Sequence, residues 1–118
     1  MDDQLPRLEA LAGEQLSSVI FVADYVQFDF NGPGLTAISD PIVVRGETRV
    51  RFPDPGSRDA LCSLIQQYVK SASAIESERI EVTFDSGDRL LVPLDRASYT
   101  GPEAATFSDP KAQGLLVW

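Results

Sequence analysis

Hydrophobic residues recur at helical spacing in the middle of the chain. The positions at i, i+3, i+4, i+7, i+8 and i+11 are Leu61, Leu64, Ile65, Tyr68, Val69 and Ala72. Such a stripe is typical of an amphipathic helix that buries one face. Asp54 as N-cap followed by Pro55 suits a helix start, and Ser57 is an alternative cap. The pattern predicts one main helix over Asp54–Ala74.

Upstream of this segment the pattern changes to alternation. Val26, Phe28 and Phe30 alternate with polar residues, which predicts a half-buried strand. The apolar stretch 16–30 is long for one straight strand, so we expect a bend or bulge near Ala23. A glycine-rich turn over 31–34 would then place Phe30 opposite Leu35.

A third strand is expected over Ile42–Phe52, interrupted at Gly46. Downstream of the predicted helix, alternating apolar residues over 80–84 predict another strand. A three-residue loop after it would pair Phe84 with Leu90 and bring Asp85 opposite Arg89. The apolar end of the chain, 115–118, predicts a last strand or plug that holds Trp118 packed.

Together these elements predict an α+β fold, with an antiparallel sheet of about five or six strands and one main helix on one face. The expected order is β-β-β-α-β-β plus a C-terminal strand. We expect a single domain over 1–118. Within it, residues 1–15 would be a lightly packed lead-in, and residues 95–118 an irregular segment ending in an anchored strand.

Charge narrows the range of partners. The chain has 18 acidic and 10 basic residues and a formal net charge of −8. A nucleic-acid binder or a protein on an anionic membrane neutralises phosphates with basic residues, so both roles are disfavoured. A basic protein would instead be attracted to this field, although plain solubility explains the charge too.

Cysteine use and hydropathy suggest a cytoplasmic location. The single cysteine, Cys62, makes no internal disulfide, which suits a reducing compartment. The start of the chain is acidic where a secretory signal is basic, and no apolar run approaches the roughly 18 residues of a bilayer span. Cys62 lies beside the apolar stripe, and we expect it to be buried and inert.

The chain has few residues suited to catalysis or metal binding. It contains no histidine, which removes the commonest general base and a main metal ligand, so we expect no cofactor, no metal and no enzyme activity. Asp85 and Asp88 fit a solvated turn better than a calcium loop. A carboxylate pair such as Asp24 and Glu103 leaves a carboxylate-based enzyme open as an alternative.

Two further groups bear on binding. Arg45, Arg49 and Arg51 are the main basic concentration, and ion pairing explains them better than an anion site. Tyr25, Tyr99 and Trp118 are amphipathic aromatics of a kind enriched at interfaces, although ordinary packing explains them as well.

Several short runs resemble a known type of protein. They are Gly13, Phe21 with 25–28, Phe84–Gly87, and Tyr99–Phe107 with Leu116–Trp118. In these runs the chain resembles small bacterial single-domain proteins of the domain-of-unknown-function type. Some of those are suspected immunity proteins of polymorphic toxin systems. The resemblance implies no catalytic residues and favours a protein-binding role.

We therefore predict a non-enzymatic cytosolic interaction module, in the form of an immunity-type inhibitor of a basic protein. Asp24, Tyr25, Tyr99 and Glu103 are the predicted interaction residues. The alternative is a small-molecule binder or carboxylate-based enzyme with a pocket between helix and sheet. We expect a monomer or a small homo-oligomer, the latter pairing through a free sheet edge.

Overall fold

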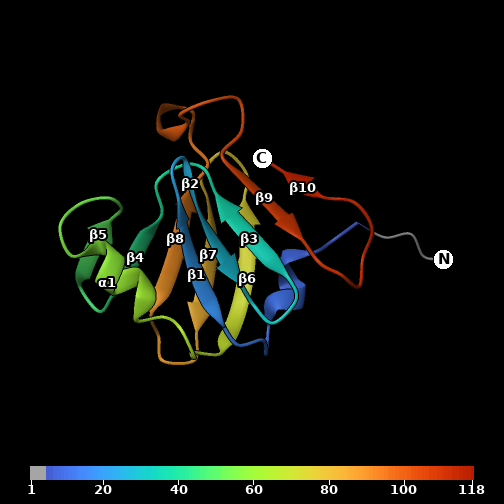
Figure 1. Cartoon of the computed structure of the whole chain (residues 1–118), viewed down its shortest axis with the longest axis horizontal. Helices are drawn as coiled ribbons and strands as arrows, with labels where there is room; N and C mark the ends of the chain where they lie inside the picture. Colours follow the sequence, from blue (N-terminus) through green and yellow to red (C-terminus); the bar gives the residue numbers. More distant parts are fainter. Residues whose placement is uncertain (1–4) are drawn as a thin grey trace.

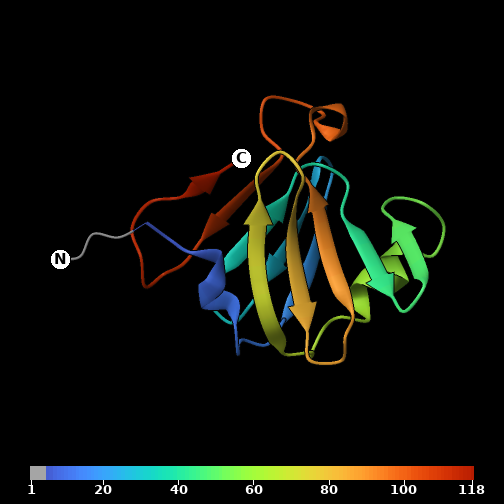
Figure 2. The same ribbon diagram turned by 180° about the vertical axis from the view of Figure 1, so that it is seen from behind.

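The computed structural model describes residues 5–118, and the strands in this range form two antiparallel sheets of five strands each. Across the first sheet the order is β1 (Ser18–Val22), β2 (Tyr25–Asp29), β3 (Gly34–Ala37), β9 (Ala105–Ser108) and β10 (Leu116–Val117). Across the second it is β5 (Thr48–Arg51), β4 (Ile42–Arg45), β8 (Arg89–Pro93), β7 (Arg79–Phe84) and β6 (Val69–Ile75). The first sheet lies in front of the second in Figure 1, and Figure 2 shows the second sheet from behind.

The core lies between the two sheets. In β2 the buried residues Val26 and Phe28 alternate with half-buried ones, and β7 shows the same alternation. Inward-facing side chains from both sheets meet in one hydrophobic cluster, whose largest fully buried members are Phe28, Phe30, Phe84 and Phe107. This is the packing of a β-sandwich, in which each sheet buries one face against the other.

Short helical segments close the sides of the sandwich. The helix α1 (Ser57–Cys62) contacts β1, β4 and β5, and it carries the buried Leu61. On the other side the 3₁₀ helix η1 (Leu8–Leu11) contacts β6 and buries Leu8 and Leu11. The second 3₁₀ helix, η2 (Arg96–Ser98), lies in the loop before β9. The light packing predicted for the lead-in segment is therefore wrong for its described part, and residues 1–4 lie outside the described range.

The predicted α+β class is wrong, because the main helix over Asp54–Ala74 does not form. The α-helix starts at Ser57, with Gly56 rather than Asp54 as its N-cap, and ends at Cys62. Gln66 then adopts a left-handed conformation with a φ of 80°, which stops helical propagation, and the chain enters β6 at Val69. The alternative function placed a pocket between a long helix and the sheet. This pocket is absent, because the long helix does not form.

A β-bulge explains why this segment resembles a helix in sequence. The pairing of β6 with β7 shifts between Val69 and Ser71, so Lys70 is an extra residue in the ladder. Val69 and Ala72 are consequently both buried although they are three residues apart. That spacing is the one that an amphipathic helix would give.

Two predicted strands are hairpins. The stretch 16–30 folds into β1 and β2, with Val22 opposite Tyr25 and a tight turn at Ala23 and Asp24. The stretch Ile42–Phe52 folds into β4 and β5 around Gly46, whose φ is 61°. The bend expected near Ala23 and the interruption expected at Gly46 are therefore chain reversals. Each reversal adds a strand, and the strands form two sheets where we predicted one.

Two predicted registers are each displaced by two residues. Leu35 lies opposite Phe28 instead of Phe30, and Leu90 lies opposite Val82 instead of Phe84. The N–H of Phe84 donates to the carbonyl of Asp88 (2.9 Å), so the three-residue turn spans 85–87 instead of the expected 86–88. Since the displacement is even, the same side chains still face the core.

The C-terminal residues are anchored as predicted. β10 pairs with β9, and the N–H of Trp118 donates to the carbonyl of Ala105 (2.9 Å). The Trp118 side chain is half-buried against the core.

Candidate interaction surface

The outer face of the first sheet is left uncovered by the fold. Because Val26, Phe28, Leu35 and Phe107 point inward, their neighbours along each strand point outward. We call this outward surface the open face, and define it by Ser18, Ile20, Val22, Tyr25, Gln27, Asp29, Thr36, Thr106, Ser108 and Val117. The registers align one row across all five strands, which runs Ile20, Gln27, Thr36, Thr106, Val117. The strands thus present a continuous flat surface.

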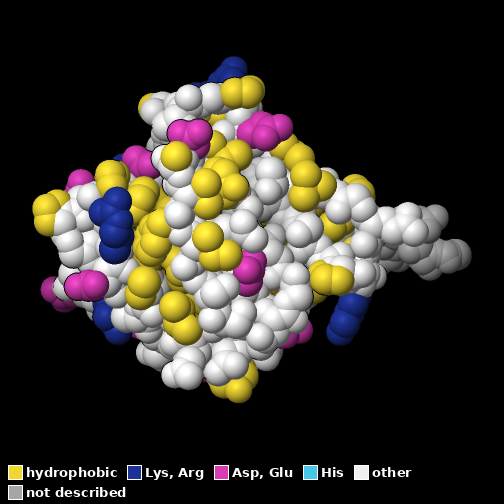
Figure 3. Space-filling view, in the orientation of Figure 1, with side chains coloured by type: hydrophobic (Ala, Val, Ile, Leu, Met, Phe, Trp, Pro, Cys, Tyr) yellow, Lys and Arg dark blue, Asp and Glu magenta, His cyan; other side chains and the backbone are white. Residues whose placement is uncertain are grey.

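The open face is almost free of charge. Asp29 is the one ionisable acid or base in the set, and its carboxylate accepts hydrogen bonds from Ser18 Oγ (3.2 Å) and Gln27 Nε2 (3.0 Å). Ile20, Val22 and Val117 are exposed hydrophobic residues on it. Figure 3 shows this side of the molecule, with hydrophobic and uncharged side chains over most of its centre and charged ones mainly around its margin.

An aromatic cluster lies along the β1 edge of the first sheet, on the inward side, because Phe21 pairs with the buried Val26. The rings of Phe21 and Phe52 stack with centroids 5.7 Å apart, and Phe21 is 36% exposed. Arg58 from α1 lies over both rings, with its guanidinium carbon 5.0 Å from the centroid of Phe52. Arginine and aromatic side chains of this kind are enriched among the residues that dominate binding energy in protein interfaces.

A cleft lined by three carboxylates lies at one end of the first sheet, and we call it the acidic cleft. It has a volume of about 460 Å³, and its carboxylates are Asp24, Asp40 and Glu103. Asp24 comes from the β1–β2 turn, Asp40 follows β3, and Glu103 lies in the loop before β9. Within residues 5–118, none of the three forms an ion pair with lysine or arginine. The cleft is therefore a local concentration of uncompensated negative charge.

The four predicted interaction residues lie around this cleft. Asp24 and Glu103 both line it, although they are far apart in sequence. Tyr25 lines an adjoining hollow of about 230 Å³ that shares Asp24 and Asp40 with the cleft. Tyr99 is half-buried against the core, directly before the cleft residue Thr100. Asp40 was missed, and the only signal for it was its place in a turn before Pro41.

The carboxylates of the acidic cleft do not converge on one point. No group of three or more His, Cys, Asp or Glu side chains within residues 5–118 is arranged to hold a metal ion. Cys62 was expected to be buried, but it is exposed at the end of α1, whose buried residues are Ser57 and Leu61.

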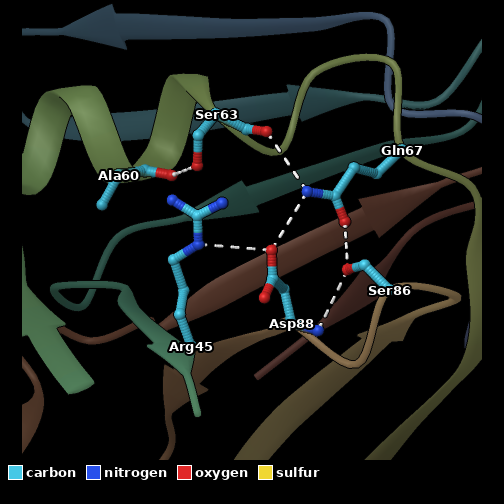
Figure 4. A network of polar contacts seen from close by, with 6 residues as sticks. All are labelled: Arg45, Ala60, Ser63, Gln67, Ser86 and Asp88. Carbon is cyan, nitrogen blue, oxygen red and sulfur yellow. Dashed lines mark hydrogen bonds and ion pairs between the residues drawn. The ribbon is translucent and has the colours of Figure 1, made fainter. Parts of the chain in front are cut away.

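A polar network joins the end of α1 to the turns around it (Figure 4). Gln67 Nε2 donates to Asp88 Oδ2 (3.1 Å) and to the carbonyl of Ser63 (3.2 Å), and Ser86 Oγ donates to Gln67 Oε1 (2.6 Å). Arg45 Nε lies 3.3 Å from Asp88 Oδ2. The members satisfy one another, so we assign this network a structural role.

Comparisons with protein-family models, curated proteins and solved structures gave no match to this chain. No helix in the described part of the chain combines the length and apolar character needed to cross a bilayer.

Proposed function

We propose that this protein is a non-enzymatic interaction module that binds a basic protein. The partner covers the open face and places a lysine or arginine side chain in the acidic cleft. An immunity-type inhibitor, the class suggested by the sequence resemblance, is a module of this kind. The observation that carries the proposal is the position of an uncompensated acidic cleft at the end of a flat, nearly uncharged sheet face.

The composition of the open face supports a protein partner. Interface cores are depleted of charged residues and surrounded by a polar rim, and the open face has that arrangement. Its single carboxylate already has two hydrogen-bond donors, so burying it leaves no lone charge without a partner.

Electrostatics favours a cationic partner. Within residues 5–118 the three cleft carboxylates form no ion pair that a partner would have to break, and the chain carries a net charge of −8. An incoming basic surface would be steered by this field, and its association would slow as salt is added.

A cytoplasmic location accompanies the proposal. Cys62 is exposed and forms no disulfide, and such thiols persist where the surroundings are reducing.

Co-purification from the native host, with mass spectrometry of retained proteins, tests the proposal. We compare the wild type with a cleft variant, D24N/D40N/E103Q, and with a matched control, D59N/E76Q/D85N. The control removes the same charge from exposed residues outside the cleft. We expect a protein with an isoelectric point above about 9 to be retained by the wild type and the control and lost from the cleft variant.

Equal retention of that partner by the cleft variant would contradict the proposal. Recovery of a bound metabolite and no protein would favour the alternative, a small-molecule binder or carboxylate-based enzyme. The observation that supports this alternative is that Asp24 and Glu103 share a cleft of about 460 Å³, a volume within the range of small-molecule sites.

A further inference from the structure

The outer face of the second sheet carries a groove with a different chemistry. Its volume is about 270 Å³, and three arginines, Arg49, Arg51 and Arg79, line it. We call it the arginine groove. The second sheet is seen from outside in Figure 2, so the groove lies on the side of the molecule opposite the open face.

The sheet topology brings these arginines together. Arg51 on β5 lies opposite Ile42 on β4, and Ile42 lies opposite Leu91 on β8. Arg79 on β7 lies opposite Pro93 of β8. Arg51 and Arg79 come from strands that are distant in sequence, yet they share one surface of the sheet. The spacing of the arginines along the chain does not predict this.

The arginines differ in how far their charges are compensated. Arg79 is paired with Glu78 (3.3 Å) and Glu81 (3.0 Å). Within residues 5–118, neither Arg49 nor Arg51 forms an ion pair. Two guanidinium groups therefore keep their charge uncompensated in a protein that is strongly acidic overall.

Neighbouring polar groups leave these two arginines available. Arg51 Nη2 makes a long hydrogen bond, 3.4 Å, to Ser98 Oγ. The Ser98 hydroxyl itself donates to Asp95 Oδ1 (2.8 Å), so Arg51 reaches this carboxylate through Ser98 and forms no direct ion pair with it. Glu78, the other carboxylate of the groove, is held by Arg79.

The floor of the groove is apolar. Ile42 and Leu91 both line it and are 5% and 3% exposed, and with Val44 they form a small hydrophobic cluster separate from the main core. Because these side chains are almost wholly covered, most of the surface that a ligand would meet in the groove is polar and comes from the residues around them.

We propose that the arginine groove binds a phosphate group, either free or on a small organic molecule. The phosphate lies between Arg49 and Arg51, whose planar guanidinium groups match the oxygen atoms of a phosphate in paired hydrogen bonds. Within residues 5–118 neither arginine is held in an ion pair, so both can contact the phosphate without breaking one.

An NMR titration with phenyl phosphate at constant ionic strength tests this site. Amide shifts of Arg51, Leu91 and Ser98 are followed in the wild type, in R49Q/R51Q, and in K70Q/K111Q, which removes two exposed cations outside the groove. We expect saturable shifts in the wild type and K70Q/K111Q, and binding weaker by about tenfold or more in R49Q/R51Q. Inorganic phosphate, titrated in the same way, should shift the same residues, because the two arginines bind the phosphate group itself.

Shifts that do not saturate, or that are the same in R49Q/R51Q as in the wild type, would overturn the site. Saturable shifts with phenyl phosphate and none with inorganic phosphate would also overturn it, because the phosphate group would then not be what the arginines bind. The groove and the acidic cleft share no residue, so this result and the co-purification result are independent.

Discussion

Gln67 connects two segments that are distant in sequence, the α1–β6 connection and the β7–β8 turn. Its side-chain amide contacts the carbonyl of Ser63, the carboxylate of Asp88 and the hydroxyl of Ser86. These contacts hold the connection between α1 and β6 against the β7–β8 turn. The side chain therefore helps to fix the point at which the chain leaves the helix and enters the second sheet.

We expect Gln67→Ala to lower the free energy of unfolding by about 2 kcal/mol, because it removes hydrogen bonds worth about 1 kcal/mol each and leaves Asp88 with fewer partners. Urea denaturation followed by tryptophan fluorescence measures the change. Gln113→Ala, at an exposed residue outside this network, should leave stability unchanged. A Gln67→Ala variant as stable as the wild type would show that the network contributes nothing to the fold.

Cys62 gives a second test at the residue scale. Its thiol is exposed, whereas its place beside the apolar stripe predicted a buried and inert cysteine. We expect the native protein to react fully with a thiol reagent such as dithionitrobenzoate without denaturant, and Cys62→Ser to be unreactive. Reaction that requires unfolding would contradict the exposure of this residue.

At the scale of elements, the region 63–75 distinguishes this fold from the predicted one. The structure pairs Ala72 with Val82 and Ala74 with Ile80 across β6 and β7. We expect cross-strand NOEs between the Ala72 and Val82 backbones and slow amide exchange in the paired part of β6. Sequential helical NOEs between residues three apart over 66–74 would instead support the long helix. The helix α1 provides an internal control, since it should show such NOEs over 57–62.

Several elements could be predicted because local sequence determines them. β2 and β7 follow from strict alternation, and the turns follow from glycine, proline and asparagine. The long helix could not be rejected, because the bulge at Lys70 places Val69 and Ala72 on one face with helical spacing. The division into two sheets was missed because Ala23–Asp24 and Gly46 were interpreted as bends rather than reversals.

The surroundings of the candidate sites depend on long-range packing. The sequence suggested Asp24 and Glu103 as an example of a carboxylate pair, and the loops place both residues in one cleft. Asp40 reaches the cleft because of the path of the β3–β4 loop. No local sequence pattern predicts that path. The arginine groove likewise needs the β4–β8–β7 order, which brings Arg79 to the side of Arg51.

At the scale of the molecule, the two sheets present unlike surfaces. The first offers a flat, nearly uncharged face with an acidic cleft at its end, and the second offers a basic groove over an apolar floor. The strand β1 is also an edge of the first sheet and carries exposed apolar residues, an arrangement through which copies of a chain can pair. The net charge of −8 opposes such pairing.

The most direct test of the proposed function is partner retention after a change at the centre of the open face. Thr36→Arg places a positive charge in the middle of the five-strand row, and Ser73→Arg places the same charge on the outer side of β6. We expect Thr36→Arg to retain the basic partner at least about tenfold less than the wild type, because like charges across an interface are costly. Ser73→Arg should retain it normally. If Thr36→Arg retained the partner as well as the wild type does, the open face would not be the binding surface.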